Sequence, residues 1–263
     1  MRYPSVAGTF YPSDKNELNK ILDSFFNETK KEVANLKKEI NEIIGIISPH
    51  AGYIYSGKTA AYGYSLLEGL QNFTFIILGP NHTGMGKLVA ISREEWMTPL
   101  GKVGNDTEIG KIIEENSEFA EFDETAHFYE HSIEVQLPFL QKVVKDPKAV
   151  EICIGMQTIE IVEDISNSLK NIKKNFCIIA SSDFTHFESS KDARKYDEKA
   201  MDYILNLDWE GFMEFAETGS ICGYGPIGIL TKYAKEEKCK VKLLKYSNSG
   251  DVTGDYSSVV GYA

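Results

Sequence analysis

Three of the five histidines in the sequence directly follow short apolar runs. IGIISPH ends at His50, FIILGPNH ends at His82, and CIIASSDFTH ends at His186. If these runs are parallel neighbouring strands, their carboxyl ends lie at one edge of a sheet, where ligands bind in open α/β folds. Imidazole nitrogens are good ligands for zinc, iron and copper. The pattern therefore predicts a shared metal or catalytic site rather than three unrelated loop histidines.

Cys222 is a fourth candidate metal ligand. It lies in SICGYGPIGIL, where the glycines and Pro226 indicate a turn that leads into a helix. A thiol near a helix N-terminus is more easily deprotonated, and the thiolate is the form that binds metals. The alternative is a small buried cysteine that only fills space. Cys153 and Cys177, which lie inside apolar runs, fit that alternative, and Cys239 has no visible partner in the sequence.

The segment EHSIEVQLPFLQ places His131 and Glu134 three residues apart, which puts both on one face of a helix. His131 is open to several roles: metal ligand, residue behind a ligand, substrate hydrogen-bonding group, or helix cap together with Glu130. Glu134 is of the type that orients metal-bound imidazoles. We expect this pair to line the same site as the other histidines.

Two further residues near these motifs are ambiguous. Asp183 lies three residues before His186. Its carboxylate could fix the tautomer of an imidazole, or it could form a turn. His127 belongs to none of the strand-to-loop motifs, and we expect it to lie on the surface.

These residues must be positioned by an alternation of short apolar runs and amphipathic stretches. The predicted strands are residues 43–47, 73–78, 88–91, 150–154, 176–180, 241–245 and 258–262. The predicted helices are residues 14–30, 57–70, 106–116, 131–145, 159–173, 191–206, 208–217 and 226–237. Asp14 and Asp106 are typical N-caps, and Pro226 suits a first helical turn. The alternation predicts a three-layer α/β/α fold with a mostly parallel or mixed sheet, in a single domain over residues 1–263.

Composition and missing motifs exclude several classes of function. The 28 basic and 39 acidic residues give a net charge of −11, which argues against general binding to nucleic acids or to anionic membrane surfaces. No run approaches the ~20 apolar residues of a membrane span. The four cysteines form no CxxC motif, which fits a reducing cytoplasm. The absence of GxxxxGK[ST] and GxSxG argues against a P-loop and an α/β-hydrolase triad.

Five motifs, taken in order, resemble one known family. They are PHAGYIYSG, LGPNH, EHSIEVQLPFL, SSDFTHF and CGYGPIG. Together they look like the Memo-like family, whose prokaryotic members are called AmmeMemoRadiSam system protein B. The resemblance extends from VAGTFYPSD to DYSSVVGYA and so covers nearly the whole chain.

The resemblance implies a fold similar to that of class III extradiol ring-cleavage dioxygenases. Those enzymes hold Fe(II) with two histidines and a glutamate, and use a further histidine as acid and base. Carried over by motif, His50 and His82 are the implied metal histidines and His186 the implied acid/base residue. Cys222 occupies the place of the third protein ligand, where the dioxygenases have a carboxylate. We expect His131 and Asp183 to line or tune the catalytic site.

The cysteine leaves the activity open. A thiolate makes the site softer, so that copper or zinc as well as iron suits it, and the thiolate can be oxidised. We expect a metal-dependent oxidoreductase using iron or copper, with a small molecule or peptide in the metal cleft. The alternatives are a partner-binding scaffold on a degenerate dioxygenase fold and a zinc-dependent hydrolase. The family name also implies a functional link to radical-SAM and AMMECR-type proteins.

Overall fold

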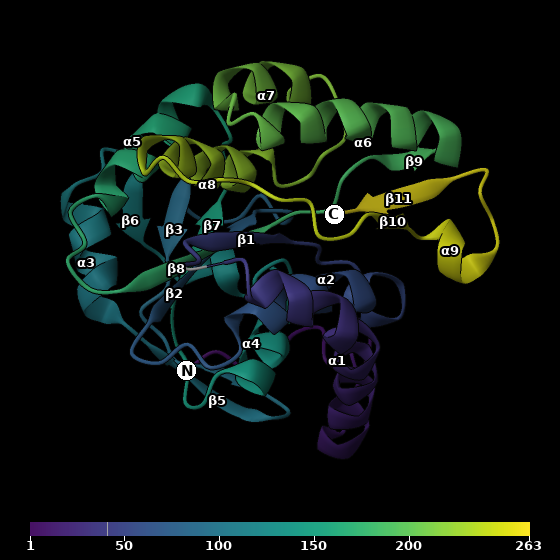
Figure 1. Ribbon diagram of the computed structural model, residues 1–263. Coiled ribbons are helices and arrows are strands. Elements are labelled where there is room, and N and C mark those ends of the chain that lie inside the picture. Colours follow the sequence, from purple (N-terminus) through teal and green to yellow (C-terminus); the bar gives the residue numbers. More distant parts are fainter. Residues whose placement is uncertain (41) are drawn as a thin grey trace.

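A central β-sheet with helices on both faces forms the body of the structure, a computed structural model that describes residues 1–40 and 42–263. The helices are α1 (Lys15–Lys37), α2 (Tyr53–Leu67), α3 (Thr107–Glu115), α4 (Leu137–Val143), α5 (Ile159–Leu169), α6 (Ser190–Leu205), α7 (Trp209–Ala216), α8 (Tyr224–Glu236) and α9 (Gly250–Thr253), with short 3-10 turns η1 (Thr125–His127) and η2 (Glu134–Gln136). Helices α5 to α8 lie above the sheet in Figure 1, and α1, α2 and α4 lie below it. The predicted three-layer α/β/α architecture is confirmed.

The sheet is mixed, with a parallel centre. Its strands are β1 (Gly45–Ser48), β2 (Thr74–Pro80), β3 (Val89–Ile91), β4 (Trp96–Thr98), β5 (Gly101–Asn105), β6 (Ala120–Phe122), β7 (Lys148–Ile154) and β8 (Phe176–Ser181). Their order is β1-β8-β2-β7-β3-β6, with β5 beside β7 and β4 beside β5. The neighbours β1, β8, β2 and β7 are parallel, whereas β3 is antiparallel to β7.

This strand order brings the chemistry-bearing loops together. Strands β1, β8 and β2 are adjacent and parallel, so their carboxyl ends, at Ser48, Ser181 and Pro80, lie at one edge of the sheet. The loops that follow lead to His50, to Asp183 and to the other motif histidines. The crevice outside the carboxyl ends of such strands is where open α/β sheets bind ligands.

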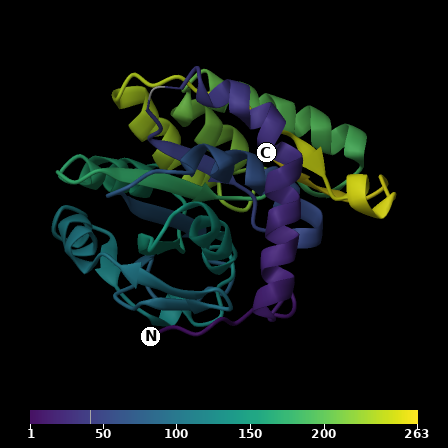
Figure 2. The same ribbon diagram turned by 60° about the horizontal axis from the view of Figure 1, so that its bottom comes forward.

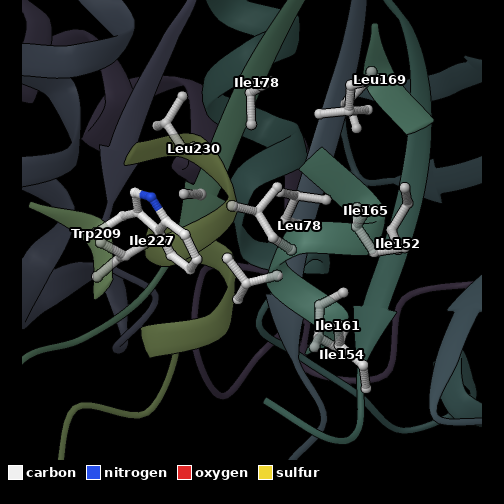
Figure 3. Packing of buried hydrophobic residues seen from close by; sticks show 14 of the residues in the cluster. Leu78, Ile152, Ile154, Ile161, Ile165, Leu169, Ile178, Trp209, Ile227 and Leu230 are labelled. Carbon is white, nitrogen blue, oxygen red and sulfur yellow. The ribbon is translucent and has the colours of Figure 1, made fainter. Parts of the chain in front are cut away.

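Continuous apolar runs make these strands because both faces of the sheet are covered. Along β2, Ile76 and Leu78 point into one hydrophobic cluster, while Phe75 and Ile77 point into the other. Figure 3 shows the first cluster, in which side chains of strands β2, β7 and β8 meet those of α5 and α8. A sheet buried on both faces gives the site a rigid base.

The predicted helix starts have the expected caps. The Asp14 side chain accepts hydrogen bonds from the backbone N–H groups of Asn16 and Glu17, and so caps α1. Asp106 caps α3 by accepting from the backbone N–H of Ile109. Pro226 is the third residue of α8, within its first turn. Local sequence therefore fixed these helix ends.

Several predictions differ from the structure. Helix α1 extends to Lys37 instead of ending at 30, α2 begins at Tyr53 instead of 57, and strands β4, β5 and β6 were not predicted. Residues 241–245 form no strand, although β1 has a free edge near them. Helix α4 covers only Leu137–Val143 of the predicted 131–145, and the preceding residues form the 3-10 turn η2. Pro138 lies in the first turn of α4. Because proline has no N–H to donate and its ring clashes with the preceding turn, the α-helix does not extend further towards residue 131.

A second, three-stranded sheet was only partly predicted. It contains β9 (His186–Glu188), β10 (Ser247–Asn248) and β11 (Val259–Tyr262) in the antiparallel order β10-β11-β9. Strand β11 confirms the prediction for residues 258–262, whereas β9 and β10 are too short for a sequence pattern. In Figure 2 this sheet and α9 project to the right, and the segment before α1 runs along the bottom of the molecule. No helix in the described residues is long and apolar enough to cross a membrane.

Glu151 makes the stability of the fold depend on pH. Its buried side chain accepts from Asn105 through Oε2, but Oε1 finds no hydrogen-bond partner within the described part of the chain. Burial raises the pKa of Glu151 to about 8, against 4.5 for an ordinary glutamate. Between these values the folded state holds a proton that the unfolded state has lost, so stability falls as pH rises through this window.

We therefore expect Glu151→Gln to remove that loss. At pH 5 the variant should unfold at nearly the same urea concentration as the wild type. At pH 8.5 it should be more stable than the wild type, by about 3–5 kcal/mol. The exposed Glu121→Gln variant is the control, and equal wild-type and Glu151→Gln curves at both pH values would contradict the assignment.

Candidate metal centre

Three imidazoles converge at the carboxyl edge of the sheet. The ring centroids of His50 and His82 are 5.1 Å apart, and that of His131 lies 5.4 Å from His50 and 4.6 Å from His82. One potential ligand atom from each lies within 4.8 Å of the other two. Three such donors at this spacing can hold one metal ion.

Glu130 orients His82. Its carboxylate lies 2.9 Å from His82 Nδ1 and also accepts from the backbone N–H groups of His82, His131 and Ser132. Burial alone would raise the pKa of Glu130, but the hydrogen bond from His82 and the other nearby donors lower it to about 2. A carboxylate only accepts, so His82 Nδ1 carries the proton and Nε2 keeps a free lone pair. A carboxylate behind an imidazole is typical of metal ligands.

A serine network sets the tautomer of His50. Its Nδ1 lies 2.9 Å from Ser181 Oγ, which already donates its proton to the carbonyl of Ser132. Ser181 Oγ also accepts from the Gln136 side chain. The serine must therefore accept from His50 Nδ1–H, which leaves the lone pair on Nε2. Burial and the neighbouring imidazoles hold the pKa of His50 well below its usual value, so the ring is neutral, the form that binds metals.

Cys222 contacts this lone pair. Its Sγ lies 3.1 Å from His50 Nε2 and 3.2 Å from the backbone N–H of Asp183. The expectation of an easily deprotonated thiol is wrong, because burial and the nearby Asp183 raise the pKa of Cys222. Since His50 Nε2 is an acceptor, the thiol donates to it. Cys222 is therefore adjacent to the site, as a protonated thiol.

The role of Asp183 in the structure differs from the two predicted ones. Its carboxylate accepts from the backbone N–H of His50 at 2.8 Å and from that of Ala51 at 3.3 Å. It thus holds the loop after β1 against the loop after β8. Burial raises the pKa of Asp183 to about 6, although these N–H groups oppose the shift. In the structure Asp183 is a loop anchor beside the site.

His186 lies outside the group of three converging imidazoles. It begins β9, and its Nδ1 lies 2.7 Å from the backbone carbonyl of Ser220. A carbonyl only accepts, so Nδ1 carries the proton and Nε2 is free to accept another. The side chain is partly exposed, as a group that exchanges protons with a bound molecule must be.

The expectation for Glu134 is wrong. Its buried carboxylate contacts no imidazole nitrogen and instead accepts from Arg2 Nη1 at 2.6 Å and from the Tyr11 hydroxyl at 2.6 Å. The backbone N–H groups of Ser5 and Val6 donate to it as well. Glu134 therefore anchors the N-terminal segment. Orienting an imidazole, the role expected of Glu134, is performed by Glu130, which contacts His82 Nδ1.

His127 is also placed differently from the expectation. It is only 1% exposed and packs edge-on against Trp96, with 5.5 Å between the ring centroids. Its Nε2 lies 3.2 Å from the Ala90 carbonyl, away from the three site histidines. Burial lowers the pKa of His127 to about 4, so it is a neutral core residue.

Sequence reasoning assigned no site role to Ser181 or Arg2, and it named Glu130 only as a possible helix cap. Glu130 precedes His131 directly, and a carboxylate beside a candidate ligand was the available signal. Ser181 ends a predicted strand at the expected edge. Arg2 contacts His127 and Glu134, more than a hundred residues later in the chain, and nothing in the sequence indicates these contacts.

Comparison with known proteins identifies the family of this chain. A family model described as "Memo-like protein" matches residues 2–263. A "MEMO1 family protein" of Methanosarcina mazei is 44% identical over all of this chain and 97% of the relative. One of Desulfurococcus amylolyticus is 44% identical, over all of this chain and 97% of that protein, and one of Archaeoglobus fulgidus is 42% identical, over all of this chain and 98% of that protein. The chain therefore belongs to the Memo-like family.

Proposed function

We propose that the protein is a metal-dependent oxidoreductase whose iron or copper ion is held by His50 and His82. The convergence of three imidazoles carries this proposal, together with the contacts that keep Nδ1 of His50 and of His82 protonated and leave Nε2 as the donor atom. Imidazole donors suit iron, copper and zinc. The third donor comes from His131, which belongs to the converging group, or from Cys222, whose Sγ contacts His50 Nε2. Cys222 would have to lose its proton on binding the metal, as coordinating thiols do.

The surrounding residues have separate tasks in this proposal. Glu130 and Ser181 keep the Nδ1 atoms of the two metal histidines protonated and their rings fixed. His186 accepts a proton from a bound small molecule at Nε2, because its Nδ1–H donates to Ser220. A bound iron or copper ion would supply the exchange of electrons. The fold of class III extradiol dioxygenases, which the family resemblance implies for this chain, supports the same division of roles.

A His186→Ala variant tests the catalytic part of the proposal. Protein reconstituted anaerobically with Fe(II) or Cu(I) is offered oxygen with catechols, other phenols, thiols and peptides, and oxygen consumption is measured. The variant should keep its metal and lose about 100-fold or more in turnover, the usual effect of removing an acid/base group. Full turnover by the variant, or no turnover of any compound by the wild type, would contradict the oxidoreductase.

Exposed aromatic side chains favour a second candidate, a peptide- or partner-binding scaffold. They belong to the segments that carry the histidines: Tyr55, Phe128, Tyr129 and Phe187 are 38%, 59%, 71% and 76% exposed. Exposed apolar side chains of this kind are typical of interaction surfaces. Co-purification with and without metal tests this candidate, and a Tyr129→Ser/Phe187→Ser variant should lose any partner that the wild type retains.

A zinc-dependent hydrolase is the third candidate. Zinc on the same ligands would lower the pKa of a bound water, and His186 would then act as base. Tightly bound zinc with hydrolysis of an amide or ester would favour it over the oxidoreductase.

The free cysteines support a location in a reducing cytoplasm. The family resemblance supports a functional link to radical-SAM and AMMECR-type proteins.

A further inference from the structure

A cavity lies along the outer edge of the sheet, and none of the site histidines lines it. Its volume is about 800 Å³, within the range of small-molecule sites. Strand β1 forms one wall, helices α2, α6 and α8 contribute further walls, and residues 238–245 line the side opposite β1.

The walls of this edge cavity are mainly apolar and incompletely buried. Ile43, Ile44 and Ile47 line it from the β1 side and are only half-buried. Val241 and Leu244 line it from the opposite segment and are half-buried as well. Apolar side chains gathered around a hollow leave surface in contact with water that an apolar ligand would cover.

Residues 241–245 face β1 across this cavity without pairing with it. Among the residues that the structure describes, strand β1 pairs only with β8, so its other edge is free. No backbone hydrogen bond joins 241–245 to β1 within residues 1–40 and 42–263. The two segments share the cavity walls instead, which places the hollow between a free sheet edge and a segment of strand-like sequence.

Lysines gather where residues 238–245 border the cavity. Lys238, Lys240, Lys242 and Lys245 are all lining residues, in a chain whose net charge is −11. The acidic lining residues are Glu39 and Glu42, and Glu39 is paired with Lys242 at 3.2 Å. Lys238 and Lys240 are exposed and form no ion pair within the described residues. The rim therefore carries a local excess of positive charge.

We propose that this edge cavity binds a single-chain amphiphile with an anionic head, such as a fatty acid. The apolar walls of β1, α6 and α8 enclose the hydrocarbon chain. The head group lies at the rim, where Lys238 and Lys240 attract it. An anionic head complements the lysines, and an alkyl chain complements the half-buried isoleucines and leucines.

Calorimetric titration with monomeric dodecanoate, below its micelle concentration, tests the proposal. One dodecanoate should bind per chain, and decanoate should bind more weakly, by up to about fourfold for each methylene removed. Ala234 lies on α8 in the cavity wall, and Ala234→Phe should fill the space and weaken dodecanoate binding at least tenfold. No binding by the wild type, or undiminished binding by a folded Ala234→Phe variant, would overturn the proposal.

A charge variant tests the rim without disturbing the core. Lys238→Glu/Lys240→Glu should weaken dodecanoate several-fold and leave uncharged dodecanol unaffected. Lys191→Glu/Lys195→Glu, the same change at exposed positions of α6 outside the cavity, should bind dodecanoate as the wild type does. Equal dodecanoate affinity in both double variants, or binding to phosphatidylglycerol vesicles without binding of free dodecanoate, would contradict a pocket for a free anionic amphiphile.

Discussion

Replacing Arg2 by Met should lower the free energy of unfolding by about 3–5 kcal/mol, a large fraction of the stability of an ordinary domain. Arg2 is buried, and its guanidinium donates to Glu134 and to the carbonyl groups of His127 and Glu130 at 2.6, 2.8 and 2.9 Å. Its Cζ also lies 4.0 Å from the centroid of the Trp96 ring. The variant leaves the fully buried Glu134 carboxylate without its cation, which is the costly way to break a buried pair.

Urea unfolding measures this effect against a matched surface variant. Arg194→Met removes an arginine from a pair with Glu198 that is about half exposed on both sides, and it should cost less than about 1 kcal/mol. The double variant Arg2→Met/Glu134→Leu should recover part of the loss, because no lone charge remains buried. An Arg2→Met variant as stable as Arg194→Met would show that the N-terminal anchor does not stabilise the fold.

His82→Ala and His50→Ala should each weaken metal binding by about 100- to 1000-fold. A structural zinc ion contributes roughly 10–16 kcal/mol over four ligands, or about 2.5–4 kcal/mol for each ligand. Competition with a chelator of known affinity measures the change. His127→Gln is the control, since His127 is a buried histidine that faces Trp96 and not the site. A His82→Ala variant that binds the metal with wild-type affinity would show that His82 is not a metal ligand.

The same titration assigns the third donor. If Cys222 is a ligand, Cys222→Ser should lose affinity on the scale of His82→Ala, and His131→Ala should lose much less. If His131 is the ligand, the order of the two losses is reversed. The geometry admits both, because His131 belongs to the converging group and Cys222 contacts His50 Nε2.

Local patterns predicted the parts of the fold that local physics determines. The apolar runs ending near Ser48, Pro80 and Ser181 became the buried parallel strands, because a sheet covered on both faces needs such runs. Their adjacency then brought His50 and His82 together, as the strand-to-loop placement of the histidines indicated.

Contacts between distant segments could not be predicted in the same way. Glu134 was expected beside an imidazole because the two residues share a helix face, but η2 and Pro138 replace that helix. The partner of Glu134 is Arg2, and a separation of 132 residues leaves no local signal for this ion pair. His127 was expected at the surface, whereas the same N-terminal anchor and Trp96 bury it.

Residues 241–245 show the limit of strand propensity. The short, largely apolar segment VKLLK was predicted as a strand, and β1 offers a free edge among the described residues. A strand also needs a partner strand at hydrogen-bonding distance. Residues 241–245 lack one among the described residues, because the cavity lies between them and β1. Pairing depends on the tertiary arrangement, which sequence periodicity does not contain.

The central claim, that these histidines hold a metal ion, is tested most directly by measuring metal content. The protein is purified anaerobically without a metal-binding tag, and iron, copper, zinc and manganese are measured per chain before and after reconstitution with Fe(II) or Cu(I). The account predicts close to one iron or copper ion per chain, lost in His82→Ala and retained in His127→Gln. No bound metal in the wild type after reconstitution would contradict it and favour the partner-binding scaffold.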